Sequence, residues 1–219
     1  NGAEVDRGDK RGRTPLDFAK REDHDAVVAL LEEHLDSKFP LHAAARTGDV
    51  DAMTQLLDGG AAVDAKKDGA TPLFVACEGG HVEAARLLLD KGADVNRANE
   101  KGATPLFIAC WNGHVDAVRL LLDNGAEVDR VDKWGNTPLL AACLKGHVDA
   151  ARLLLDKGAK ASRAAKDGST PLAIAKREDH DAVVALLEEH LDSKFPLHAA
   201  ARTGDVDAMT QLLDGGAEV

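Results

Sequence analysis

Aromatic residues are scarce in this 219-residue chain: they make up 3% of it, and tyrosine is absent. The apolar residues, 44% of the total, are therefore mainly Leu, Ala and Val. Such side chains suit tight packing between helices and argue against a large ligand pocket lined by aromatic rings. No apolar run reaches roughly 18 residues, so the sequence predicts no membrane-spanning helix. A formal net charge of −11 disfavours non-specific binding to DNA or RNA.

The motifs of common enzyme classes are also missing. The patterns G-x-S-x-G, G-x-G-x-x-G and G-x-x-x-x-G-K-[ST] do not occur, which removes the signatures of serine hydrolases, dinucleotide-binding folds and P-loop NTPases. The serines lie in segments of turn or cap character, with no base beside them in the sequence: Ser37, Ser162, Ser169 and Ser193. We therefore expect no catalytic residue, no cofactor and no enzyme activity.

Cysteine is rare and regularly placed. Cys77, Cys110 and Cys143 are the only three, and each lies 33 residues from the next. Helices stacked about 8–10 Å apart hold Cα atoms beyond the roughly 7 Å that a disulfide spans. We expect three reduced, buried thiols that act as small apolar residues, in an intracellular protein. A metal-binding or redox role for them is the alternative.

A recurring stretch accounts for most of the chain. Residues 71–96, TPLFVACEGGHVEAARLLLDKGADVN, return three times in steps of 33, the last time in part. Thr71 can cap a helix through its hydroxyl, and Pro72 suits the first helical turn. The pair Gly79-Gly80 ends that helix, and a leucine-rich second helix follows it. Two short helices cannot bury enough surface alone, so neighbouring units must stack. The units begin at Thr14, Phe39, Thr71, Thr104, Thr137, Thr170 and Phe195.

The period and the recurring Thr-Pro-Leu and Gly-His pairs resemble the ankyrin repeat family. The resemblance covers the whole chain and implies an all-α solenoid of stacked helix pairs with finger loops. It also implies a non-catalytic scaffold for protein–protein interaction, whose partner the sequence does not name. The histidine of the family's T-P-L-H pattern is kept only at His42 and His198, and we expect Phe74 and Phe107 to pack in its place.

Two short spacings divide the chain. The steps from Thr14 to Phe39 and from Thr170 to Phe195 are 25 residues, which is eight fewer than 33 and about the length of a finger. Residues 20–61 and 176–217 are also identical, which indicates recent duplication or engineering. We predict that residues 1–37 are the closing repeat of a preceding module, 38–192 a complete module of five repeats, and 193–219 the opening repeat of a following module.

We expect one continuous solenoid, in which the stack passes through residues 35–39 and 191–195 as tight helix–helix turns. A hinge between separate modules is the alternative. The chain opens within a repeat and has no initiator Met, so we also expect it to be an excerpt of a longer chain.

The positions that the repeat scaffold does not need are the candidate functional residues. The family resemblance implies that partners bind a concave face made by finger tips and the exposed ends of the first helices. Tryptophan is enriched at binding hot spots, so we expect both indoles to be exposed there; the alternative is that each covers a neighbouring repeat. The fingers also carry basic residues that are candidates for binding. The alternative is that these residues only form a solvated edge. The candidates are Glu78, Trp111, Asn112, Leu144 and Lys145 on the helices, and Lys101, Arg130, Lys133 and Trp134 on the fingers.

In five of the units, a histidine that follows a glycine or an aspartate stands at the start of the second helix. Residues about 10 Å apart cannot bind one metal ion together, so we expect these histidines to be structural and no metal to be bound. They are His24, His81, His114, His147 and His180.

The two ends of the chain suggest a second role. Val27, Leu30 and Leu31 near one end, and Met209 and Leu213 near the other, would leave part of the apolar seam uncovered. Unlike surfaces that meet head to tail without closing form filaments. The alternative function is therefore a structural or engineered array, in which copies of the chain associate head to tail.

Overall fold

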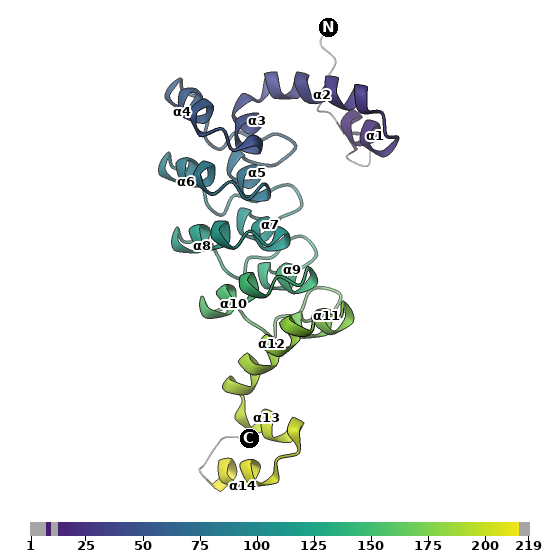
Figure 1. Ribbon diagram of the computed structural model, residues 1–219, viewed down its shortest axis with the longest axis vertical. Coiled ribbons are helices and arrows are strands. Elements are labelled where there is room, and N and C mark those ends of the chain that lie inside the picture. The colour runs from purple at the N-terminus through teal and green to yellow at the C-terminus, as the bar shows by residue number, and fades with distance from the viewer. Residues whose placement is uncertain (1–7, 10–12, 215–219) are drawn as a thin grey trace.

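The computed structural model describes residues 8–9 and 13–214, and in these ranges the chain forms fourteen helices and no strand (Figure 1). The predicted all-α class is confirmed. No helix within these ranges is long and apolar enough to cross a membrane. The helices are α1 (Pro15–Arg21), α2 (Asp25–Lys38), α3 (Pro40–Thr47), α4 (Val50–Asp58), α5 (Pro72–Glu78), α6 (Val82–Asp90), α7 (Pro105–Asn112), α8 (Val115–Asp123), α9 (Pro138–Leu144), α10 (Val148–Asp156), α11 (Pro171–Arg177), α12 (Asp181–Lys194), α13 (Pro196–Thr203) and α14 (Val206–Asp214).

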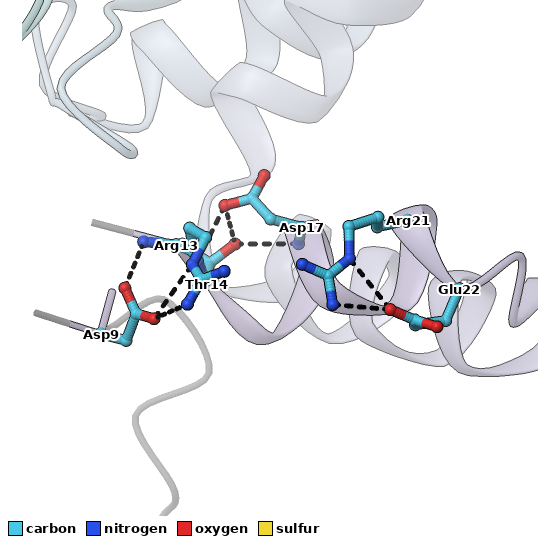
Figure 2. Close-up of polar contacts among 6 residues, drawn as sticks. All are labelled: Asp9, Arg13, Thr14, Asp17, Arg21 and Glu22. Atoms are coloured by element: carbon cyan, nitrogen blue, oxygen red, sulfur yellow. Dashed lines mark hydrogen bonds and ion pairs between the residues drawn. The ribbon is translucent and has the colours of Figure 1, made fainter. Parts of the chain in front are cut away.

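The first helix of a unit starts where the Thr-Pro-Leu motif predicts. The Thr71 hydroxyl oxygen accepts a hydrogen bond from the Phe74 amide at 3.2 Å, and α7, α9 and α11 begin in the same way. In α1 the cap is reciprocal, because Asp17 Oδ2 also accepts from the Thr14 amide at 2.7 Å (Figure 2). These caps satisfy amides that the first turn of a helix leaves unpaired.

Five helix pairs form one stack. The first helices α3, α5, α7, α9 and α11 lie side by side in one layer, and the second helices α4, α6, α8, α10 and α12 form the other layer (Figure 1). One continuous core of Leu, Ala, Val and Cys side chains runs through the stack, with Leu73, Leu106 and Leu139 almost fully buried. Because each pair contributes only a few of these side chains, the core exists only when pairs are stacked.

In four of the five stacked pairs, a histidine is hydrogen-bonded to the pair before it. His81 begins α6, and its Nε2 lies 2.9 Å from the carbonyl oxygen of Arg46, at the end of α3. A carbonyl oxygen can only accept, so Nε2 is the donor. The bond satisfies a carbonyl that the end of a helix leaves unpaired. The same contact, at 3.1 Å, joins His114 to Glu78, His147 to Trp111 and His180 to Leu144. We call it the histidine joint.

The histidine joint also requires a glycine opposite the ring. Gly113 has a φ of +74°, and a Cβ atom there would lie 2.5 Å from Nδ1 of His147. A larger residue would be strained at this φ and would collide with the imidazole. Three more glycines meet a histidine of the next pair in the same way: Gly48, Gly80 and Gly146.

The outermost pairs, α1–α2 and α13–α14, do not continue the stack. α1 packs on α2 and α13 packs on α14, but the side-by-side packing of first helices ends at α3 and at α11 (Figure 1). The turns at residues 35–39 and 191–195 are as tight as expected, because the single residue Phe39 or Phe195 joins two helices. The expectation of one continuous solenoid is therefore wrong at these two places. The division of the chain into three modules stays a prediction.

The stack is interrupted at α1–α2 and α13–α14 for a physical reason. α2 and α12 are 14 residues long, whereas α6 has nine. The two longer helices therefore carry the chain past the point at which the second helix of a stacked pair ends. No finger follows them to return the chain to the layer of first helices. An ion pair between Arg46 and Asp36 at 2.5 Å holds the first of these elbows, and Arg202 and Asp192 pair at the second. A groove of about 490 Å³ consequently lies open beside α3 and α4.

His147→Ala tests the histidine joint, because it removes the Nε2 donor and leaves the Trp111 carbonyl unpaired. We expect the free energy of unfolding to fall by about 1–3 kcal/mol. His24 is the matched control: it begins α2, but its ring is exposed and has no hydrogen-bond partner among residues 8–9 and 13–214. His24→Ala should change the same quantity by less than about 0.5 kcal/mol. Guanidinium unfolding of dilute protein measures both, and equal losses would contradict the joint.

Candidate functional site

The inner surface of the stack, made by the ends of the first helices and the finger tips, contains Trp111. This residue lies near the end of α7 and is half-buried. Its ring stacks on Phe107, with centroids 6.2 Å apart and an interplanar angle of 22°. Nζ of Lys145, from the next pair, lies over the indole at 4.5 Å from its centroid. A cation at this distance is attracted by the ring, so the contact ties α7 to the C-terminal end of α9.

A small second cluster supports this surface. Phe74 and Phe107 are 6% and 8% exposed, and they pack with Ala103 and Ala141 apart from the main core. Trp111 is partly buried against the same cluster. Both phenylalanines occupy the fourth position of the Thr-Pro-Leu-x motif, and the predicted packing there is confirmed.

Trp134 is carried by a finger whose shape is fixed. The indole is 55% exposed, whereas Asp132 beside it is only 6% exposed. Asp132 Oδ1 accepts from the amides of Trp134 at 2.9 Å and Asn136 at 2.8 Å, and Oδ2 accepts from Nδ2 of Asn136 at 2.9 Å. Gly135 supplies the φ of +85° that the turn needs. The backbone under Trp134 is therefore ordered before any partner binds, which lowers the entropic cost of binding.

Neighbouring fingers are linked through their backbones. The Lys133 amide donates to the Lys101 carbonyl at 2.9 Å, and the Lys166 amide donates to the Trp134 carbonyl at 3.0 Å. The ammonium group of Lys166 donates to the Lys133 carbonyl at 2.7 Å. The side chains of Lys101 and Lys133 are exposed, so the finger row presents positive charge on a rigid edge.

The remaining candidate residues are engaged in contacts within the protein. Asn112 Nδ2 donates to the carbonyl of Glu78 at 2.9 Å, and both side chains are exposed. Arg130 forms an exposed ion pair with Glu127 at 3.1 Å. Leu144 is half-buried at the end of α9.

The structure thus separates the two tryptophans. Trp111 belongs to the helix surface with Lys145, while Trp134 belongs to the fingers with Lys101 and Lys133. The expectation that both indoles are exposed is met by Trp134, at 55%, but not by Trp111, which is half-buried because Phe107 and Lys145 cover part of its ring. That the nine candidates bind a partner stays a prediction.

Asp132, whose carboxylate holds the finger turn, is not among the predicted residues. A signal was present, because an aspartate or asparagine that precedes a glycine by three residues is typical of a turn held by its own side chain. Asn99 shows the same pattern: its Oδ1 accepts from the amides of Lys101 at 2.9 Å and Ala103 at 3.0 Å.

Comparison with known families identifies the architecture. The model described as Ankyrin repeats (3 copies) matches residues 32–99, 97–165 and 127–195, and the model described as Ankyrin repeat matches residues 192–219. The chain belongs to the ankyrin repeat family. A search of curated proteins found no match.

Of the five histidines predicted to be structural, four have a structural contact, whereas the ring of His24 is exposed and has no hydrogen-bond partner in the described ranges. The four donate to main-chain carbonyls in the histidine joint. In the part of the chain that the structure describes, no group of three or more His, Cys, Asp or Glu residues is placed to hold a metal ion.

The three cysteines are free and completely buried, which confirms the predicted packing role. Burial raises the pKa of the Cys143 thiol to about 12. It also raises the pKa values of Cys77 and Cys110, the latter being next to both other thiols. Because only the thiolate is a good nucleophile, these side chains are inert in the folded ankyrin stack.

Thiol labelling checks this conclusion. At pH 8, we expect none of the three thiols to react with Ellman's reagent within seconds in the native protein, because each is both buried and protonated. All three should react within seconds in concentrated guanidinium chloride. Labelling of any native cysteine as fast as in the unfolded control would show that the core is open at that position.

Proposed function

We propose that this chain is a non-catalytic scaffold that binds a protein partner on the inner surface of its five-pair stack. Ankyrin repeats generally mediate protein–protein interaction, and proteins of this family are typically scaffolds rather than enzymes. The observation that carries the proposal is Trp134, a large apolar side chain left 55% exposed on a finger that Asp132 holds in place. Exposed tryptophan on rigid backbone is well suited to a binding hot spot.

The charges of the fingers favour one kind of partner surface. Lys101 and Lys133 are exposed beside Trp134, and Lys145 is exposed over Trp111. An apolar partner side chain flanked by acidic groups would complement this arrangement. Long-range attraction of that kind speeds association and fixes orientation more than it adds affinity.

We also infer where the partner is met. Three reduced, buried thiols support an intracellular location. The net charge of −11 argues against nucleic acid as the partner.

Affinity capture with matched variants tests the proposal. A partner captured by the wild-type chain should bind Trp134→Ala more weakly by about 2 kcal/mol or more, because truncation removes the hot spot. Arg119→Ala is the control, since Arg119 is exposed on α8 in the outer layer. Isothermal titration of the captured partner gives both affinities. Unchanged affinity for Trp134→Ala, with loss for Arg119→Ala, would contradict the proposal, because the partner would then bind the outer layer.

A structural role is the second candidate function. The specific observation in its favour is that large apolar side chains of the outermost pairs, Leu30 and Val206 among them, are 65% and 74% exposed. In this role the chain would associate with further copies of itself.

A further inference from the structure

The duplicated segment lets one sequence be compared in two surroundings. Residues 20–61 and 176–217 are identical, and within the described ranges they fold alike. Phe39 and Phe195 have φ, ψ values of −128°, 62° and −132°, 69°, and Lys20–Glu32 and Lys176–Glu188 form the same ion pair. Any difference in burial between the two copies is therefore due to their neighbours.

Each copy exposes the surface that the other buries. Val183 in α12 is fully buried, whereas the identical Val27 in α2 is 46% exposed. Because α1 packs on α2 as α11 packs on α12, the difference arises from α9 and α10, which precede only the second copy. Conversely, Ala45 in α3 is fully buried by the following pair, whereas the identical Ala201 in α13 is exposed.

The same two surfaces hold the separate halves of a histidine joint. His24 occupies the position of His81, His114, His147 and His180, but no carbonyl among the described residues accepts from it. Gly204 has a φ of +70°, like the glycines of the joint. At those glycines a histidine ring lies within 4 Å of the position that a Cβ atom would occupy, but at Gly204 no atom does. The pair α1–α2 thus offers a donor that no described residue accepts, and the pair α13–α14 offers the matching empty position.

We propose that two copies of this chain associate head to tail, with α1–α2 of one copy stacked on α13–α14 of the next. His24 then donates to the Arg202 carbonyl of the other copy, and its ring packs against Gly204. Within the chain this joint already connects each consecutive pair from α3–α4 to α11–α12, so the proposed contact continues an interface that the protein uses four times. The two surfaces differ from each other, so each added copy leaves one of each kind open and the assembly grows.

Sedimentation velocity from about 1 μM to about 1 mM tests the association. We expect the average mass of the 219-residue chain to rise steadily with concentration. Val27→Arg and Ala201→Arg, each placing a charge on one of the two surfaces, should remain monomeric throughout. Ala29→Arg is the control, because this position is exposed in both copies of the duplicated segment, at Ala29 and Ala185. It should associate like the wild type.

A mixture of the two blocked variants establishes the direction of the contact. Val27→Arg keeps α13–α14 intact, and Ala201→Arg keeps α1–α2 intact, so the mixture should form a dimer and stop there. His24→Ala should weaken the wild-type association about tenfold, the loss of one hydrogen bond. A wild-type chain that stays monomeric at all concentrations would overturn the proposal, as would association that persists in Val27→Arg.

This contact rests on the structural role proposed above and does not depend on the partner-binding role. Both blocking positions lie outside the finger row, so capture of a protein partner should be the same for Val27→Arg and for the wild type. Failure of one proposal therefore leaves the other standing.

Discussion

Packing against a neighbour stabilises each of the five helix pairs of the stack. The duplicated segment shows this without a mutation, because the same valine is fully buried as Val183 and 46% exposed as Val27. Burying one such side chain is worth about 1.5–3 kcal/mol, which is large against the stability of a two-helix unit. The continuous core, the position of the fingers and the rigidity of the inner surface all depend on stacking.

The histidine joint and its glycine set how the pairs approach one another, and they use few positions. The residue that supplies the carbonyl can therefore vary: Arg46, Glu78, Trp111 and Leu144 all serve, since only their main-chain oxygen is needed. Their side chains are left to form the inner surface. The scaffold and the recognition surface thus share residues without competing for the same atoms.

Much of the scaffold could be predicted because it depends on local patterns. Threonine caps, the buried cysteines and the period of 33 follow from residue type and spacing. The bond from each histidine to the preceding pair, and the cover of Trp111 by Lys145, depend on contacts about 34–36 residues apart, which only the stack creates. The short steps of 25 residues revealed a missing finger, but the length of α2 decides where the chain then goes.

Amide hydrogen exchange on the two copies of the duplicated segment is the most direct test of neighbour stabilisation. Identical sequences have the same intrinsic exchange rates, so any difference in dilute, monomeric protein reports the neighbours alone. The amide of Ala45 should exchange at least about tenfold more slowly than that of Ala201, and Val183 more slowly than Val27 by a similar factor. Equal protection at both pairs of positions would contradict the account, because each helix pair would then be stable by itself.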